Sequence, residues 1–143
     1  QKGNPKSIRR LQDLTRADVI LANREKGSIR RIYLDKELKK EKILAADISG
    51  YRKELVSDLS TAAAVGSGMA DAALGEEYVA RQSPNLDFLP LTTMPMYLVA
   101  EEASLSKPGF TAMLEIVKSE DFRTGIHGQT GYDIKHTGEV TYL

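Results

Sequence analysis

Apolar residues along the chain alternate between short compact runs and helical spacings, a pattern typical of alternating strands and helices. Residues 19–22 form an apolar run bounded by charged residues, which predicts a buried strand that ends at Asn23. Apolar side chains then recur at helical spacing over residues 29–38, directly after Gly27 and Ser28. The order predicts a strand followed by a loop and a helix.

A second polar helix start follows farther along the chain. Ser57 is expected to cap a helix whose apolar stripe consists of small residues, and the glycine-rich segment 66–68 is expected to end it. Residues 69–75 then read as a short buried strand, whereas residues 48–51 fit either a strand or a loop. Residues 8–14 have the spacing of a short helix. This order favours the α/β class over an all-α fold.

The part of the chain from residue 76 onward shows the same two patterns. Residues 76–81 predict a short helix, and residues 87–91 and 96–100 predict two strands. Pro90 and Pro95, within or directly before these strands, argue for positions at sheet edges or crossings. Residues 110–117 predict an amphipathic helix, and a serine cap predicts another helix over residues 119–126. The segment beyond them is rich in glycine and turn-like.

Composition narrows the functional classes. The 143 residues include 20 basic and 20 acidic side chains and no cysteine, which excludes disulfides, thiol nucleophiles and zinc–thiolate sites. Residues 1–42 hold 13 basic and 6 acidic side chains, a local charge of +7 that residues 43–143 balance. This basic third would attract an anion or a nucleic acid, although its Lys-rich run at 39–42 reads first as the solvated end of a helix.

Other features bear on compartment and completeness. No apolar run approaches the ~18 residues of a membrane span, and no signal peptide is apparent at the start. The chain begins with Gln1 rather than Met, so we expect it to be a fragment of a longer protein.

The two polar helix starts are the candidate binding chemistry. Helix N-termini carry unpaired backbone N–H groups and a positive dipole end, so two that converge form a pocket for a small anion. Ser28 would donate its hydroxyl and backbone N–H to an oxyanion, with Arg24 or Arg31 adding charge-assisted hydrogen bonds. The alternative is that Ser28 only caps its helix.

The second helix start allows similar alternatives. The hydroxyls of Ser57, Ser60 and Thr61 suit a tetrahedral anion, but such residues are common in first turns anyway. Asp58 either selects a cationic or hydroxyl-bearing ligand or simply complements the helix dipole. Tyr97 would reach a cleft from a crossing strand or pack between two lobes.

Three further polar residues are not expected to bind a ligand or a metal ion. Asp71 is expected to be a buried carboxylate that accepts backbone hydrogen bonds. His127 and His136 lack further ligands at metal-binding spacing, so no metal site is expected. The sequence contains no Gly-x-Ser-x-Gly elbow, Walker loop or Gly-x-Gly-x-x-Gly fingerprint, and we expect no enzyme activity and no cofactor.

An ordered set of motifs resembles a known family. These motifs are Asn23-Arg24-x-x-Gly27-Ser28-x-x-Arg31, Gly50-Tyr51, Ala62-Ala63-Ala64-Val65-x-Ser67-Gly68-x-Ala70-Asp71-x-x-Leu74-Gly75, Leu86-Asp87-Phe88-x-Pro90-Leu91, Phe122-Arg123 and Gly131-Tyr132-Asp133. Together they resemble the second half of the periplasmic-binding-protein-like domain that is fused to molybdopterin-biosynthesis-type proteins and to helix-turn-helix regulators of molybdate metabolism. The chain departs from that family's pattern at Ile29, where the family has glycine, and at Asp58, where it has histidine.

The resemblance implies a fold and a domain organisation. It implies an α/β class with three layers, a mixed, mainly parallel sheet flanked by helices, as one lobe of a type II periplasmic-binding-protein-like fold. Residues 1–143 would be a single ligand-binding-like domain, with about 5–95 as the second lobe and about 96–143 as a return segment toward the first lobe.

The resemblance also implies a function. It implies binding or sensing of a small anionic ligand, an oxyanion such as molybdate or tungstate, in a cytoplasmic protein of molybdenum-cofactor biosynthesis or a transcriptional regulator. Fused helix-turn-helix or molybdopterin-biosynthesis domains are the implied partners. The expected ligand-binding residues are Asn23, Arg24, Gly27, Ser28, Arg31, Ser57, Asp58, Thr61 and Tyr97. The alternative is a non-catalytic protein–protein module that binds no metabolite and pairs either with itself, as a homodimer, or with a catalytic domain of the same polypeptide.

Overall fold

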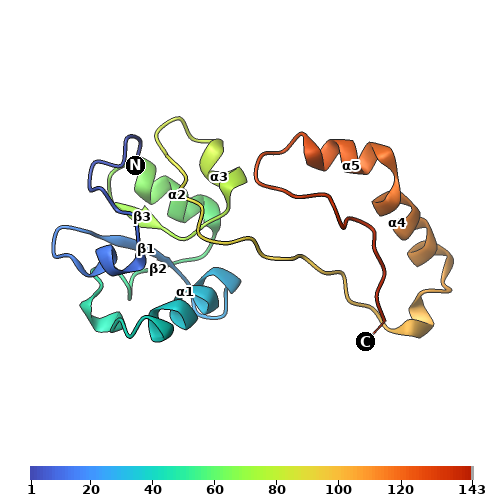
Figure 1. Cartoon of the computed structure of the whole chain (residues 1–143), viewed down its shortest axis with the longest axis horizontal. Coiled ribbons are helices and arrows are strands. Elements are labelled where there is room, and N and C mark those ends of the chain that lie inside the picture. Colours follow the sequence, from blue (N-terminus) through green and yellow to red (C-terminus); the bar gives the residue numbers. More distant parts are fainter. Residues whose placement is uncertain (143) are drawn as a thin grey trace. The chain divides into compact units, whose positions relative to one another are not determined.

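Strand β1 (Leu21–Arg24) is the centre of a three-stranded parallel sheet. Strand β2 (Glu54–Leu55) pairs with it on one side and β3 (Ala72–Ala73) on the other, giving the order β2-β1-β3. The computed structural model describes residues 1–142 and divides into two units, Gln1–Pro90 (unit 1) and Leu91–Leu143 (unit 2); unit 1 contains the whole of this sheet (Figure 1). The expected α/β class with a parallel sheet is confirmed for the described chain.

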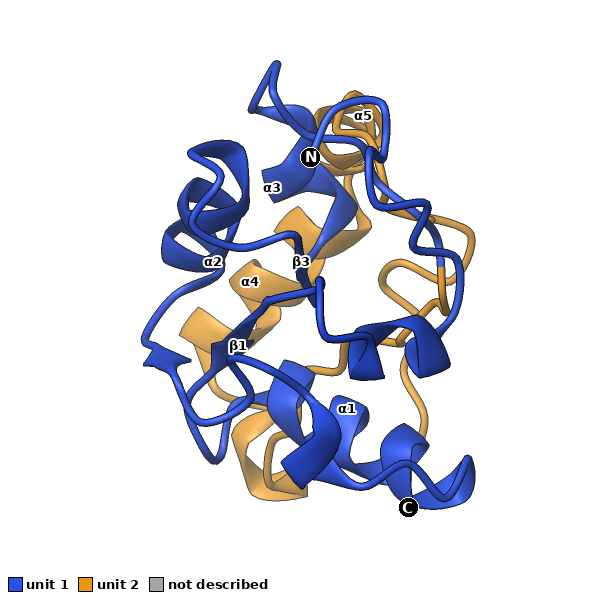
Figure 2. Cartoon of the chain, turned by 90° about the vertical axis from the view of Figure 1, so that its left-hand side faces the viewer, with its two compact units in different colours: residues 1–90 blue, residues 91–143 orange. Residues whose placement is uncertain are grey.

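Helices cover both faces of the sheet in unit 1. Helix α1 (Ile29–Lys40) packs on one face and α2 (Asp58–Gly66) on the other (Figures 1 and 2), and α3 (Glu77–Arg81) contacts α2. Adjacent residues of β1 point to opposite faces, as strand geometry requires. Leu21 therefore joins the cluster on the α1 side and Ala22 the cluster on the α2 side.

The two clusters differ in the size of their side chains. The cluster on the α1 side is built from large aliphatic residues: Leu14, Val19, Leu21, Leu34, Leu38, Ile43 and Ile48. The cluster on the α2 side is built from small ones: Ala22, Ala64, Val65 and Ala70. Small side chains let α2 approach the sheet closely, as its sequence predicts.

Both helix starts form as the sequence predicts. The Ser28 hydroxyl accepts a hydrogen bond from the backbone N–H of Arg31 at 3.2 Å. Ser57 and Ser60 cap α2 reciprocally, each side chain accepting from the other's backbone N–H at 3.0 and 3.1 Å. These caps satisfy backbone donors that the helices leave unpaired, so Ser28 and Ser57 have a structural role whether or not they bind a ligand.

Unit 2 consists of short helices and extended chain. It contains a 3-10 turn, η3 (Glu102–Ser104), and two helices that contact each other, α4 (Pro108–Lys118) and α5 (Glu120–His127), with Ser119 as the cap of α5 (Figure 2). Both helices are close to their predicted positions. None of residues 91–142 is buried, so the described part of unit 2 has no hydrophobic core of its own.

Several expected strands are wrong. Residues 87–91 and 96–100 form no strand, because no strand of the described chain pairs with them and prolines lie within or beside both. Residues 48–51, for which a strand and a loop are both expected alternatives, form a turn, and the strand of that region is β2. Of the strand expected over 69–75, only β3 pairs with the sheet.

The expected helix over residues 8–14 is also wrong. Only a 3-10 helix, η1 (Leu11–Thr15), forms there. The Asn4 side chain both donates to and accepts from the backbone of Ile8, and Ser7 has a left-handed φ of +50°. This local hydrogen bonding competes with the first turn of a helix.

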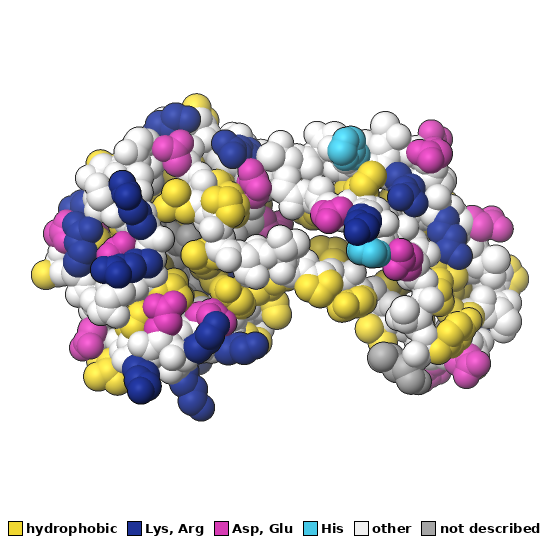
Figure 3. Space-filling view, viewed as in Figure 1, with side chains coloured by type: hydrophobic (Ala, Val, Ile, Leu, Met, Phe, Trp, Pro, Cys, Tyr) yellow, Lys and Arg dark blue, Asp and Glu magenta, His cyan; other side chains and the backbone are white. Residues whose placement is uncertain are grey.

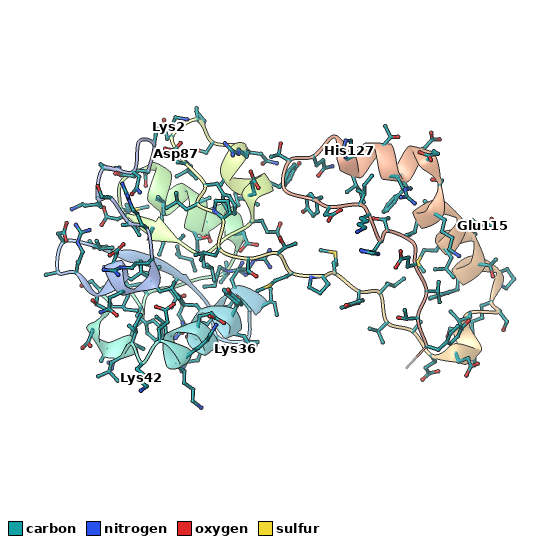
Figure 4. The ribbon with its side chains drawn as sticks, in the orientation of Figure 1. Lys2, Lys36, Lys42, Asp87, Glu115 and His127 are labelled. Atoms are coloured by element: carbon teal, nitrogen blue, oxygen red, sulfur yellow. The ribbon has the colours of Figure 1, made fainter. Side chains whose placement is uncertain are left out.

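The first residues of the chain are tied to the end of unit 1. Asp87 forms an ion pair with Lys2 at 3.2 Å and accepts from the backbone N–H of Gly3 at 2.7 Å, and Figure 4 shows the labelled side chains of Lys2 and Asp87 together. The backbone N–H of Lys2 also donates to the carbonyl of Asn85 at 2.8 Å. The N-terminal segment therefore packs as part of unit 1.

Candidate functional site

The candidate site lies where β1 and β2 end and α1 and α2 begin. The strands are parallel, so their carboxyl ends share one edge of the sheet, and each is followed by a loop that leads into a capped helix. In open α/β sheets this edge is where ligands bind. Gly27 lies in the first of these loops with a φ of +91°, and apart from its chain neighbours no residue has an atom within 4 Å of the point that a Cβ would occupy, so the loop is open there.

Arg24 joins the end of β1 to the end of β2. Its Nε donates to the carbonyl of Leu55 at 3.2 Å, and its Nη2 donates to the carbonyl of Val56 at 3.0 Å. Nη2 also pairs with Glu25 at 3.2 Å, and Nη1 forms an ion pair with Asp58. The Arg24 side chain is only 12% exposed. Its hydrogen bonds to the two carbonyls hold the guanidinium in place at the end of the neighbouring strand.

Asp58, the first residue of α2, lies between two guanidinium groups. One carboxylate oxygen pairs with Arg24, and the other lies 3.3 Å from Nη2 of Arg30. Arg30 also forms an ion pair with Glu76, which precedes α3. The starts of α1, α2 and α3 are thus connected by one network of alternating charges.

Arg30 belongs to this network although the sequence pattern alone does not single it out. It follows the cap of α1 by two positions, beside Arg31, and the signal that identifies it is the presence of two arginines in the first turn of a helix. Cations there are unfavourable for the helix dipole, so such residues call for a partner elsewhere in the fold.

Arg31 points into the protein. Its side chain is 4% exposed and donates to the carbonyl of Arg24 at 3.1 Å, to Asp35 at 2.9 Å and to Glu54 at 3.4 Å. Its guanidinium also lies over the ring of Tyr51. From the interior of the protein, Arg31 therefore fixes the end of β1 through its hydrogen bond to the Arg24 carbonyl.

Burial raises the pKa of Tyr51, and the hydrogen bond from its hydroxyl to Asp35 adds to the shift. The neighbouring Arg31 acts in the opposite direction, because a cation favours the phenolate. The phenol is therefore the donor in this cluster at neutral pH.

The remaining expected binding residues have different surroundings. Asn23 is buried, donates to the carbonyl of Tyr51 at 2.9 Å and accepts from the backbone N–H of Arg24 at 3.0 Å. Thr61 is buried, and its hydroxyl donates to the carbonyl of Asp58 at 2.9 Å. Tyr97 lies in unit 2 and is 75% exposed. The described chain thus assembles Arg24, Ser28, Ser57 and Asp58 at one edge, with Asn23, Arg31 and Thr61 supporting it.

Asp71 accepts a backbone hydrogen bond, as the sequence predicts, but it is half-buried rather than buried. Its carboxylate accepts from the backbone N–H of Ile20 at 2.8 Å, and its own N–H donates to the carbonyl of Ile20 at 2.8 Å. This pair of bonds connects the approach to β3 with the residue that precedes β1. Asp71 is thereby occupied in joining two strands.

Other surfaces of the described residues are weaker candidates for a binding site. An open cavity of about 350 Å³ lies beside the end of α1, lined among others by Leu38, Lys42 and Tyr51. Lys36 extends from α1 and Lys42 from the turn that follows it (Figure 4), and many basic side chains gather on unit 1 (Figure 3). Among residues 1–142, no group of three or more His, Asp or Glu side chains is placed to hold a metal ion, and no helix is long and apolar enough to cross a membrane.

Residues 1–118 match the model of the PBP superfamily domain. The chain belongs to this family. The expected periplasmic-binding-protein-like domain is therefore confirmed, and membership indicates small-ligand binding, in a family whose binding domains are generally non-catalytic.

Two curated relatives are uncharacterized proteins. The chain is 37% identical over 140 residues to YvgK of Bacillus subtilis, a match that covers 98% of the chain and 44% of YvgK. It is 35% identical over 109 residues to a Clostridium pasteurianum protein described as lying in the 5′ region of a ferredoxin 2Fe-2S gene, covering 76% of the chain and 96% of that protein. The chain thus spans less than half the length of YvgK, and no solved structure matches it.

Proposed function

We propose that the chain binds a small oxyanion, of the molybdate or tungstate class, at the edge where β1 and β2 end. The observation that carries the proposal is the convergence of two capped helix starts with two arginines, Arg24 and Arg30, on that edge. Backbone N–H groups at helix starts and guanidinium groups are the donors that bind oxyanions. Membership of the PBP superfamily domain supports small-ligand binding in general.

Each residue has a role in this proposal. Ser28 and Ser57 would donate their hydroxyls to the anion from the two helix starts, and Arg24 would supply charge. Gly27 would leave room for the anion to approach the first loop, whose glycine has open space around it. Asn23, Arg31 and Thr61 would hold the backbone of the strand ends and of α2 in position.

The wider context of the protein is also part of the proposal. We infer a sensor or binding domain, without catalysis, of a cytoplasmic protein of molybdenum-cofactor biosynthesis or of a regulator with a fused helix-turn-helix domain. Residues 5–95 would form one lobe, and residues 96–143 would return toward another, bringing Tyr97 to the ligand. The exposure of Met96 and Val99, at 84% and 83%, supports a role for that segment in packing against further protein.

Calorimetric titration with molybdate, tungstate, sulfate and phosphate tests the proposal. The chain and the longer relative YvgK should both be titrated. Replacing both Ser28 and Ser57 with Ala should weaken binding, whereas Ser119→Ala, which removes an equivalent cap from α5, should not. Unchanged affinity in the double variant, or no binding by the chain and by YvgK, would overturn the proposal.

One observation favours a second function. Residues 94–99 carry five apolar side chains that are each at least 44% exposed: Met94, Met96, Tyr97, Leu98 and Val99. Such a segment in extended chain is suited to pairing with another polypeptide, as in a homodimerisation module that binds no metabolite. Light scattering after size-exclusion chromatography tests this alternative, which a monomeric chain would contradict.

A further inference from the structure

We propose that the Asp58 carboxylate acts as an internal anion that occupies Arg24 and Arg30, so that an oxyanion binds only by displacing it. This inference rests on the proposed oxyanion binding and deepens it, because it makes Asp58 the residue that sets affinity and charge selectivity.

The geometry of the ion pairs is the first argument. The two oxygens of Asp58 contact different arginines, one at the end of β1 and one in the first turn of α1. A carboxylate that bridges two guanidinium groups makes the contacts that a bound oxyanion would make with the same donors. Asp58 also lies at the start of α2, beside the cap residue Ser57, where negative charge is stabilised by the helix dipole.

The second argument is that the arginines do not depend on Asp58 for their position. Arg24 donates to the backbone carbonyls of Leu55 and Val56, so its guanidinium stays at the strand ends when the carboxylate moves away. Arg30 keeps its ion pair with Glu76. Displacement of Asp58 therefore exposes a receptor that is already assembled.

Burial and charge give the third argument. The side chains of Arg24, Arg30 and Asp58 are 12%, 21% and 19% exposed, so the carboxylate interacts strongly with the arginines and still touches solvent, from which an anion can exchange. The two arginines, Arg24 and Arg30, face three carboxylates, those of Glu25, Asp58 and Glu76, so the network has a formal charge of −1 and repels an approaching anion until Asp58 moves away. The repulsion grows with the charge of the anion, so Asp58 penalises dianions more than monoanions.

The test is Asp58→Asn, with calorimetric titration of sulfate and molybdate as dianions and nitrate as a monoanion. The substitution keeps the size of the side chain and its position at the helix start and removes its charge. We expect dianion affinity to rise roughly tenfold or more, and nitrate affinity to rise less. Asp18→Asn is the matched control, because Asp18 pairs with Arg16 at 2.8 Å on an exposed surface and its loss changes the net charge equally.

The outcomes separate this inference from the proposed function. If the unmodified chain binds an oxyanion and Asp58→Asn binds it with equal or lower affinity, the inference alone is overturned. Binding seen only in Asp58→Asn would support it directly, whereas binding by neither protein would overturn the proposed function and the inference together. Asp58→Ser, checked by thermal unfolding, provides a second folded variant without the carboxylate.

Discussion

The guanidinium of Arg31 lies 4.1 Å from the centre of the Tyr51 ring. The Tyr51 hydroxyl donates to Asp35 at 2.6 Å, and Asp35 in turn accepts from Nε of Arg31 at 2.9 Å, so the three side chains form a closed cluster. Because Arg31 also donates to the carbonyl of Arg24, this cluster fixes the end of β1 that carries the candidate site. The stability of the site therefore depends on the cluster of Arg31, Asp35 and Tyr51.

Replacing Arg31 with Lys should destabilise the fold. Lysine has no planar fork to reach Asp35, Glu54 and the Arg24 carbonyl together, and it stacks poorly on Tyr51. We expect a loss of about 1–3 kcal/mol in the free energy of unfolding, measured by urea denaturation. Arg9→Lys, at an exposed position, should leave that free energy unchanged, and equal unfolding curves for both variants would contradict the assigned role.

Alkaline pH should weaken the fold through Tyr51. Burial, together with the hydrogen bond to Asp35, raises the pKa of Tyr51 above its ordinary value of 10.0, so the folded state binds the phenolic proton more tightly than the unfolded state does. The corresponding stability is fully present below the unfolded pKa and is lost as the pH rises through the folded one.

Urea denaturation between about pH 8 and about pH 11 measures this effect. The stability of the unmodified protein should fall more steeply with pH than that of Tyr51→Phe, which has no phenol to ionise there. Tyr33→Phe leaves Tyr51 in place and should show the steeper fall. Parallel pH profiles for the unmodified protein and Tyr51→Phe would refute the explanation.

The elements that the sequence predicts well are those determined by local interactions. The apolar run before Asn23 marks the place of β1, although the strand begins only at Leu21 and continues to Arg24. The hydroxyls of Ser28 and Ser57 form caps with N–H groups three residues away, so a short window of sequence suffices. The strand expected over residues 96–100 requires a partner strand, and local sequence carries no information on whether one is present.

The location of the candidate site is predictable from the sequence. The ion pairs that connect its residues are harder to predict. A strand end followed by a capped helix is visible in sequence, and this pattern selects Arg24 and Asp58. The partners of an arginine depend on which way the helix turns it: Arg31 faces inward to Tyr51, whereas its neighbour Arg30 reaches Asp58. Only the packed helix decides between the two.

Gly50 should tolerate no side chain. It has a left-handed φ of +84°, and a Cβ there would overlap the backbone carbonyl of Leu21 in β1. Gly50→Ala must therefore shift the central strand, and we expect a loss of more than about 2 kcal/mol in the free energy of unfolding. Gly27→Ala provides the comparison, because Gly27 has a similar φ of +91° in open space and its replacement should cost only about 1 kcal/mol. Similar losses for both would contradict the role of the close approach.

Unit 1 should fold without unit 2. All residues that are buried in the described chain lie within unit 1, and Asp87, which ties down Lys2 and Gly3, also belongs to it. A chain shortened to end at Pro90 should keep a Tm within about 3 °C of the original, because few buried contacts are removed. Circular dichroism at a helix wavelength measures both the Tm and the lost signal of α4 and α5.

The same experiment separates two roles of residues 91–143. An unchanged Tm together with improved solubility would mean that the exposed apolar segment, residues 94–99, adds nothing to unit 1 and is available for pairing with other protein. A Tm lowered by about 10 °C or more, roughly the effect of losing several kcal/mol from a domain of this size, would mean instead that unit 2 covers part of unit 1 in solution. That result would contradict the independence of unit 1 and would place its stability partly in α4 and α5.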